Sequence, residues 1–298
     1  MKHGKNKRLT DSHPYSDSSI VVATMHEKEK VIGPVLNSYL RATVVVPNIN
    51  TDSLGTFCGH IKRKDNALET AIHKALKGIN EASLTLGIAN EGSFFNDSIT
   101  LIGIVNHEIM VFIDTQRELK IVEEMVSYDT NFARYEIKSS QFEYESDFKE
   151  FLVKSRFDSH ALIVYGLENK EVVESAKGIT SYEVLVDKVK KLLSLGLNDI
   201  IVETDMRAHC NPTRMKNIEQ LAKKLIKRVV SLCVECNTPG FGITELVPGL
   251  PCHLCNNPTD LIKEEKYGCL KCNYKETKLY SRNPRYYAEP YECSICNP

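Results

Sequence analysis

The sequence predicts an α/β domain with a mixed sheet flanked by helices, followed by a small cysteine-rich domain. Over residues 19–232, short strand-like apolar runs alternate with segments of helical periodicity. Helices between strand-like runs predict parallel pairs, and runs that follow each other directly predict antiparallel pairs. From residue 233 to residue 298 the helical periodicity stops and Gly, Pro, Asn and Cys accumulate. We therefore place the domain boundary between residues 232 and 233.

The individual elements follow from the periodicity of the apolar residues. We expect strands at residues 19–24, 42–47, 84–89, 99–105, 109–114, 160–165 and 199–204, with weaker strands near residues 120 and 135. We expect helices at residues 28–41, from 66, from 147, at 182–195 and over a last stripe from 218 to 232. Gly196 is placed to stop the fourth of these helices. The polar residues 106–108 between two strand-like runs predict a hairpin turn.

The overall composition is that of an ordinary globular protein. Hydrophobic residues make up 42% and charged residues 26% of the 298 residues, and the formal net charge is −1. This charge argues against a protein that coats nucleic acid by bulk electrostatics. No run approaches the roughly 18 apolar residues of a membrane span. Residues 1–18 are polar without the apolar core of an export signal, so we expect a disordered tail rather than a nucleic-acid-binding arm, and a cytoplasmic protein.

Eight of the ten cysteines form four Cys-x-x-Cys pairs. These are Cys233/Cys236, Cys252/Cys255, Cys269/Cys272 and Cys293/Cys296. Such a turn directs two thiolates to one side, which is half of a tetrahedral Zn²⁺ shell with Zn–S of about 2.3 Å. Turn-forming residues, beginning with Asn, follow each pair and allow backbone amides to donate to the sulfurs. Four pairs so close together favour structural zinc over a redox pair. We predict a double zinc ribbon over residues 233–298, with two closed, non-catalytic Zn²⁺ sites.

The spacing of the pairs leaves more than one partner scheme open. Thirteen residues separate Cys255 from Cys269, a plausible hairpin span, so we expect the two inner pairs to share one ion and the two outer pairs the other. A sequential arrangement also satisfies the spacing. Between Lys263 and Arg285 there are seven Lys/Arg and three Glu, interleaved with Tyr. This run is either a solvated hairpin face or a nucleic-acid surface on which Tyr stacks against bases.

The most polar stretch of the larger domain runs from Glu203 to Arg214. If its backbone is extended, one face of the strand carries Glu203, Asp205, Arg207, His209 and Asn211. Pro212 suits the first position of the following helix and leaves Asn211 as its N-cap. The segment then leads from the end of a strand into a helix N-terminus, where anions bind well. The alternative is a buried ion-pair network that caps the last helix.

The residue types in this stretch and in three other loops predict a polar site on one rim. Arg207 and Arg214 suit a phosphate or carboxylate, Glu203 and Asp205 suit Mg²⁺ or Mn²⁺, and His209 suits proton transfer. Loops after the first three strands add Lys28, Thr56, Glu91 and Ser93. We predict Glu91, Asp205 and His209 as catalytic residues, and as phosphate-binding residues Lys28, Thr56, Ser93, Arg207, Asn211 and Arg214. Cys58 and Cys210 are more typical of small buried thiols than of nucleophiles.

Several segments resemble an uncharacterised bacterial domain family of unknown function. They are Asp52–Phe57, Asn90–Phe94, Ser159–Val164, Lys177–Ile179, Thr204–Arg214 and Pro239–Gly242. The resemblance implies that the polar loops belong together, and it brings no activity.

A second resemblance, at the level of the fold, is to the Maf/inosine-triphosphatase nucleotide pyrophosphatases. It rests on Ala23–Lys28, Lys74-Ala75 and Glu91-Gly92. It implies that Lys28 or Lys30 contacts phosphate and that Glu91 binds Mg²⁺. The chain departs from that pattern at His26, where Asn is expected, and residues 203–214 have no counterpart.

Two functions are therefore compatible with the sequence. The first is a divalent-metal-dependent hydrolase of a phosphorylated small molecule, with a nucleotide as one candidate. The second is a zinc-ribbon module that binds RNA, DNA or a protein without catalysis.

Overall fold

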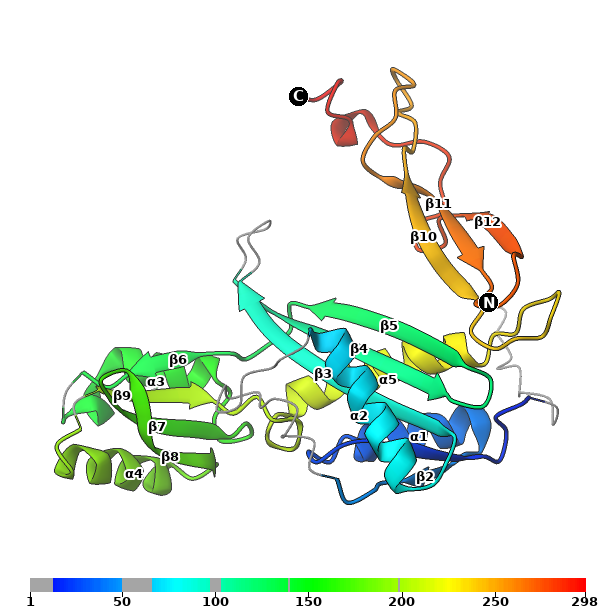
Figure 1. Ribbon diagram of the computed structural model, residues 1–298. Helices are drawn as coiled ribbons and strands as arrows, with labels where there is room; N and C mark the ends of the chain where they lie inside the picture. Colours follow the sequence, from blue (N-terminus) through cyan, green and yellow to red (C-terminus); the bar gives the residue numbers. More distant parts are fainter. Residues whose placement is uncertain (1–12, 50–65, 97–102, 139, 198) are drawn as a thin grey trace. The chain divides into compact units, whose positions relative to one another are not determined.

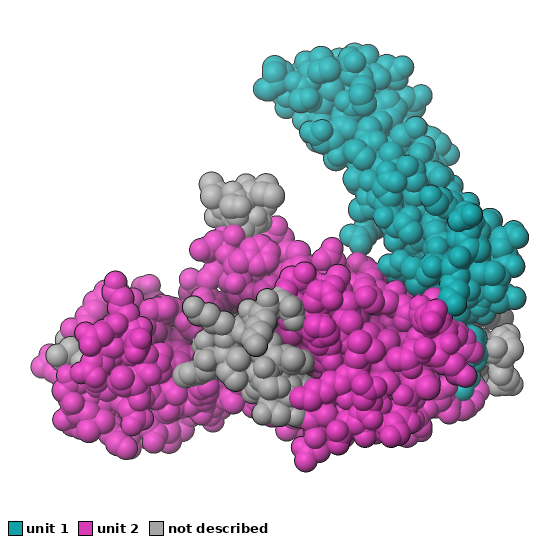
Figure 2. Space-filling view, in the orientation of Figure 1, with its two compact units in different colours: residues 1–16, 226–298 teal, residues 17–225 magenta. Residues whose placement is uncertain are grey.

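The structure, a computed structural model, describes residues 13–49, 66–96, 103–138, 140–197 and 199–298. The chain divides into two compact units, which Figure 2 colours separately. The larger unit is residues 17–225, and the smaller unit is residues 226–298 together with residues 1–16. Among the described residues, none of the helices combines the length and apolar character needed to cross a membrane.

The larger unit contains the expected mixed sheet. Its five strands have the order β2-β1-β3-β4-β5, of which β2, β3, β4 and β5 are labelled in Figure 1. The strands are β1 (Ser19–Val22), β2 (Thr43–Val45), β3 (Leu86–Asn96), β4 (Ile104–Asp114) and β5 (Leu119–Ser127). β1 runs parallel to β2 and β3, whereas β3, β4 and β5 are antiparallel neighbours. Parallel pairs thus arise where a helix separates two strands, as predicted.

Helices flank this sheet because packing against it buries their apolar faces. The connecting helices are α1 (Glu29–Leu40) and α2 (Ala67–Glu81). α2 packs Ala71, Ala75 and Ile79 with residues of β1, β3 and β4 in one buried cluster. The Asn66 side chain accepts a hydrogen bond from the Glu69 amide and begins α2, which confirms this predicted start.

β4 is a single long strand, so the hairpin predicted at residues 106–108 is wrong. Glu108 pairs in register with Gly92 of β3, and the Glu108 side chain is completely buried. Polar residues are typical of turns, but Glu108 can lie within a strand because its carboxylate forms a buried ion pair. β3 likewise continues through residues 90–93, which we predicted as a loop. Residues 99–102 of the other predicted strand lie outside the described residues.

The larger unit also contains a second sheet, which is fully antiparallel. From the sequence we predicted a single mixed sheet and did not distinguish the two. The order of the second sheet is β6-β9-β7-β8, with β6 (Arg134–Glu136), β7 (Leu162–Glu168), β8 (Glu171–Ile179) and β9 (Asp199–Thr204). Helices α3 (Ser146–Lys154) and α4 (Tyr182–Ser194) contribute Phe148, Leu185 and Val189 to its core. β8 escapes prediction because it is an edge strand whose residues are mostly exposed, so no apolar alternation marks it. Gly196, with φ of +81°, follows the end of α4 as expected.

The last helix, α5 (Pro212–Val229), begins where the sequence places it. Pro212 is its first residue, and Asn211 Oδ1 accepts the Arg214 amide at 2.9 Å, so Asn211 is the N-cap. Within the larger unit, Asn217 of α5 donates to Asn106 of β4, and Lys224 donates to the Glu124 carbonyl of β5. α5 therefore contacts the first sheet through β4 and β5.

The smaller unit is a three-stranded antiparallel ribbon with the order β10-β11-β12 (Figure 1). The strands are β10 (Gly242–Pro248), β11 (Ile262–Gly268) and β12 (Lys275–Leu279). Residues 1–12 of the predicted tail lie outside the described residues. Tyr15, which belongs to that predicted tail, is fully buried.

Candidate metal centres and polar site

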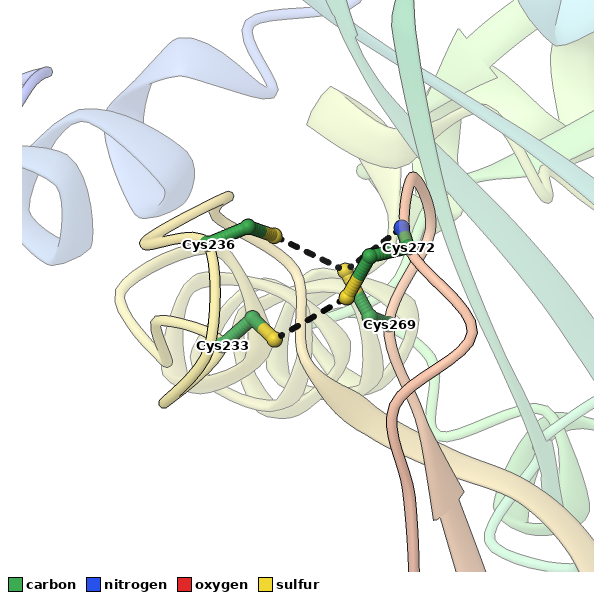
Figure 3. A group of neighbouring side chains, drawn as sticks. All are labelled: Cys233, Cys236, Cys269 and Cys272. Carbon is green, nitrogen blue, oxygen red and sulfur yellow. Dashed lines mark hydrogen bonds between the residues drawn. The ribbon is translucent and has the colours of Figure 1, made fainter.

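The eight paired cysteines gather into two groups of four. The first cluster is Cys233, Cys236, Cys269 and Cys272, and the second cluster is Cys252, Cys255, Cys293 and Cys296. Figure 3 shows the first cluster, where Sγ–Sγ distances are 3.6 Å for Cys233–Cys272 and 3.5 Å for Cys236–Cys269. In the second cluster the Sγ–Sγ distances are 3.8 Å for Cys252–Cys296 and 3.7 Å for Cys255–Cys293.

These distances fit a metal and not disulfides. A tetrahedral ion with metal–sulfur bonds of about 2.3 Å separates its sulfur ligands by about 3.8 Å. A disulfide would bring two sulfurs to about 2.05 Å. The clusters are therefore compatible with two structural metal ions, and an all-thiolate tetrahedral set fits Zn²⁺.

The backbone around the pairs curls as predicted. Asn237 and Asn256, which follow the first two pairs, have φ of 55° and 63°. Their amides donate to the carbonyls of Cys233 and Cys252 at 2.8 and 2.9 Å. The Leu254 amide donates to Cys252 Sγ at 3.4 Å. A left-handed Asn thus closes each of these two turns, and an amide inside the second turn donates to its sulfur.

The partner scheme differs from both predicted arrangements. The first pair joins the third, and the second joins the fourth, whereas we expected nested or sequential partners. The reason is the β10–β11 hairpin, whose ladder runs from Gly242–Gly268 at one end to Pro248–Ile262 at the other. Cys236 precedes β10 and Cys269 follows β11, so both lie at the first end of the hairpin. The pair Cys252/Cys255 lies between the two strands and is therefore at the other end. Seven residues of β10 separate the two ends by roughly 20 Å.

In the larger unit, the predicted anion-binding Arg214 belongs to a buried ion pair. Arg214 Nε donates to Glu108 Oε1 at 2.7 Å, and Arg214 Nη1 donates to the Met206 carbonyl at 2.6 Å. Both side chains are almost completely buried. Asn90 and Asn106 each donate to the Glu108 carboxylate at 3.0 Å. Burial opposes ionisation of Glu108, but the charge and hydrogen bonds of Arg214, with Lys28 and Asn106, hold the pKa of this carboxyl below its ordinary value.

Gly92 allows β3 to pass directly beside this ion pair. A Cβ atom at Gly92 would overlap Arg214 Nη2 and both carboxylate oxygens of Glu108. Because these groups are buried and held by several partners, they have little room to move away.

We therefore expect Gly92→Ala to lower the free energy of unfolding by about 1–3 kcal/mol. Chemical denaturation of the full chain measures this effect. Gly33→Ala in α1 is the matched control, because a Cβ there meets Val44 at an ordinary 3.5 Å. A Gly92→Ala protein as stable as wild type would contradict this close packing of β3 against the ion pair.

Lys28 and Glu91 are buried next to this ion pair. Lys28 Nζ donates to the Asn90 carbonyl at 2.8 Å, and burial together with nearby Arg214 lowers the pKa of Lys28 to about 7. Glu91 forms an ion pair with Lys74 of α2. Among the described residues, Asn90 Oδ1 has no hydrogen-bond partner although it is buried, so a solvent or ligand donor would complete it.

The alternating polar face predicted for residues 203–211 is wrong because the strand ends at Thr204. Residues 208–210 form a short 3₁₀ turn instead. The Asp205 carboxylate accepts from Arg207 Nη2 at 2.6 Å and from the Gly178 amide at 3.1 Å. Glu203 instead lines a groove with Arg134 and Tyr165, and burial raises its pKa. Glu203 and Asp205 therefore face different surroundings.

The α5 N-terminus is also occupied by side chains. Asn211 caps the Arg214 amide, and the Thr213 amide donates to His160 Nε2 at 3.2 Å. Asn211 further donates to Asn131 at 2.8 Å. Arg214 and Asn211 thus match the capping network that we kept as the alternative for this segment.

Two histidines and an arginine near these buried ion pairs are at least partly accessible. The rings of His26, after β1, and His209, after β9, stack with centroids 5.2 Å apart and planes at 23°. His209 is exposed, and Arg207 is partly exposed at 26% of its side chain. Burial and the positive charges of Lys28, His209, Arg214 and Arg207 lower the pKa of His26 to about 3. Several cations therefore lie around His26, and two of them, Arg207 and Arg214, are paired with Asp205 and Glu108.

The other predicted site residues are less informative. Thr56 and Cys58 lie outside the described residues, and Ser93 is half-buried in β3 opposite His107. Burial raises the pKa of the Cys210 thiol to about 11, which does not favour a nucleophile. Within the described ranges, the two cysteine clusters are the sole groups of three or more His, Cys, Asp or Glu positioned to hold a metal. Glu91, Asp205 and His209 form no such group.

The basic run of the ribbon is largely neutralised. Four of its seven cations pair with carboxylates: Lys263–Glu264, Lys266–Glu245, Lys278–Glu276 and Arg285–Glu292. Lys278 also lies over the Tyr267 ring at 5.0 Å. This surface is therefore closer to the solvated hairpin face than to a phosphate-binding stripe.

Sequence reasoning missed the residues that organise the polar site. Glu108, Asn106 and Gly178 were assigned to turns or to the resemblance alone. The one sequence signal for Asn106 and Glu108 is that they alternate onto one face of β4, which follows only if residues 104–114 are taken as one strand.

Fold and site together define an α/β protein with two four-cysteine clusters in a C-terminal ribbon, each compatible with a structural metal ion. Residues 74–298 match the family described as Domain of unknown function (DUF6671). Because the match covers most of the chain, the protein belongs to this family, which confirms the resemblance to an uncharacterised domain family. A search among curated proteins finds no match.

Proposed function

We propose that the larger unit binds a phosphorylated small molecule between His26, His209 and Arg207. The observation that carries the proposal is the convergence of these three side chains from the ends of β1 and β9. His26 and His209 stack at 5.2 Å, and Arg207 is held in place by Asp205 through 2.6 and 3.0 Å hydrogen bonds. A guanidinium oriented in this way suits two oxygens of a phosphate.

The electrostatics support an anion at this position. Lys28 and Arg214 lie behind His26 and contribute to the depressed pKa of this imidazole. His26 is therefore neutral above about pH 3. A bound anion would raise the pKa of His26 toward its ordinary value, because it would offset the positive charges that lower this pKa.

The reaction class that this site supports is hydrolysis of a phosphoester or phosphoanhydride. His209 exposes an imidazole beside the anion position, where it can take a proton from the water that attacks phosphorus or give one to the oxygen of the leaving group. Mg²⁺ and Mn²⁺ are left out of the proposal, because Asp205 and Glu91 are paired with Arg207 and Lys74.

Calorimetric titration with orthophosphate, pyrophosphate and a nucleotide panel tests binding. We expect His209→Ala and Arg207→Gln to weaken the affinity at least ~10-fold, because each removes a charge-assisted hydrogen bond. The matched controls are His73→Ala, an exposed histidine of α2, and Arg134→Gln, an arginine 50% exposed on β6. Affinities that do not change in the two site variants would refute the proposal.

Phosphate release from the same panel tests the reaction. Turnover should occur without added divalent metal and should fall in His209→Ala but not in His73→Ala. Asp205→Asn removes the charge that holds Arg207 in place. We therefore expect this variant to lose more in ligand affinity than in the rate at which the bound ligand is hydrolysed. Turnover that requires Mg²⁺ or Mn²⁺ would restore the metal-dependent mechanism predicted from the sequence.

A further inference from the structure

The second cysteine cluster is surrounded by large side chains exposed to solvent. Leu254 and Ile295, each within a Cys-x-x-Cys turn, are 71% and 60% exposed. Three tyrosines of the same segment are also exposed, namely Tyr286 at 71%, Tyr287 at 50% and Tyr291 at 70%. Single exposed apolar residues are ordinary, but a concentration of this kind is typical of an interaction surface. We name these five residues the tyrosine surface.

The five residues belong to one place in the fold. The turns that carry Leu254 and Ile295 meet at the second cluster, where Cys255 and Cys293 lie 3.7 Å apart. His253 donates its amide to the Ala288 carbonyl at 2.9 Å, and its ring contacts Tyr287 at 5.6 Å. Tyr291 is tied to the same end because its carbonyl accepts from the Asn297 side chain at 3.2 Å.

Charge separates the possible partners of this surface. Residues 250–261 and 281–298 contain Arg282 and Arg285 against Asp260, Glu289 and Glu292, which leaves a net charge of −1. Arg285 and Glu292 pair through two hydrogen bonds of 2.7 and 2.9 Å and neutralise each other, so the net charge stays at −1. Four thiolates around one Zn²⁺ add a further −2. A polyanion would be repelled, and so would the same acidic surface of a second copy.

We propose that the tyrosine surface docks a partner protein through a segment in which apolar side chains alternate with Lys or Arg. The apolar side chains pack on Leu254, Ile295 and the tyrosine rings, since tyrosine gives a large contact area at low entropic cost. The basic side chains meet the acidic groups and the negative metal centre. A metal bound at the second cluster would order both turns, so we expect the surface to form only in the metal-loaded protein.

The probe is a synthetic peptide of alternating Leu and Lys with one Trp. The protein contains no Trp, so the emission of the peptide reports binding without background. We expect Leu254→Ser/Ile295→Ser to weaken the affinity at least ~10-fold. Val234→Ser/Leu270→Ser makes the equivalent change at the first cluster, where these side chains are 69% and 38% exposed, and should leave the affinity unchanged.

Four further results decide the inference. A Leu/Glu peptide and oligo(dT) should not bind, and equal binding of either would overturn the proposal. Equal weakening by both pairs of substitutions would overturn it as well. A concentration-dependent dimer that Leu254→Ser/Ile295→Ser abolishes would assign the surface to a second copy instead. Should this variant lose metal, Tyr286→Ser/Tyr291→Ser provides the same comparison with the cluster turns intact.

Discussion

Stripping the metal from the two cysteine clusters is expected to unfold the ribbon of residues 233–298. Apart from cysteine, the buried apolar residues of this segment are Pro239, Phe241, Leu250 and Ala288, too few to offset the entropy of ordering the chain. Metal binding must supply the rest, on the order of 10 kcal/mol per site. Addition of a strong chelator, followed by amide NMR and limited proteolysis, measures the loss. The larger unit should keep its signals, and a ribbon that stays ordered without metal would refute the expectation.

Metal content also tests the interleaved partner scheme. Cys233→Ser and Cys252→Ser should each bind one equivalent of zinc instead of two. Cys233→Ser/Cys269→Ser removes two ligands of one site and should still bind one equivalent, whereas Cys233→Ser/Cys252→Ser should bind none. Nested partners predict no zinc in the first double variant, and sequential partners predict one equivalent in the second. Elemental analysis of the purified variants separates the three schemes.

Arg214→Met should lower the free energy of unfolding by about 3–5 kcal/mol, because it leaves the buried Glu108 carboxylate without its counter-charge. The substitution also removes the donor to the Met206 carbonyl. Urea denaturation of the full chain measures the loss. Lys216→Met, an exposed change on the same helix, is the control and should stay within about 0.5 kcal/mol of wild type.

The double variant Glu108→Met/Arg214→Met should recover much of this stability, because no buried charge is then left unpaired. Its acid stability should also differ from that of wild type. The pKa of Glu108 lies below its ordinary value of 4.5, so its contribution is present above pH 4.5 and is lost as the pH falls through the folded-state pKa. The double variant has no carboxylate at position 108, so it should not show this loss of stability at low pH. If Arg214→Met were as stable as Glu108→Met/Arg214→Met, Glu108 and Arg214 would not be strongly coupled.

The parts of the fold that sequence predicts well are those set by neighbouring residues. Asn66 and Asn211 begin helices because their side chains reach amides three residues ahead. Asn237 and Asn256 follow cysteine pairs because Asn tolerates the left-handed backbone that closes each turn. The four Cys-x-x-Cys pairs likewise predict two metal centres without knowledge of the strands between them.

The candidate polar site was harder to predict because its partners are distant in the chain. Glu108 and Arg214 are 106 residues apart, and nothing local distinguishes Glu108 from a turn residue. The convergence of His26 and His209 requires the ends of β1 and β9 to meet, and these strands belong to two different sheets. Residue types in the sequence predicted a phosphate-recognising polar site, but not which of its charged side chains are already paired.

Local chemistry alone therefore established the cysteine turns, the helix starts and the α/β alternation, since each depends on contacts across a few residues. The assignment of thiolates to two clusters depended on the β10–β11 ladder, because an antiparallel hairpin brings the start of its first strand beside the end of its second. Tertiary packing likewise separates Arg214, buried against Glu108, from Arg207, which stays accessible. Which charges are neutralised is a property of strands and helices packed together, and no spacing along the chain encodes it.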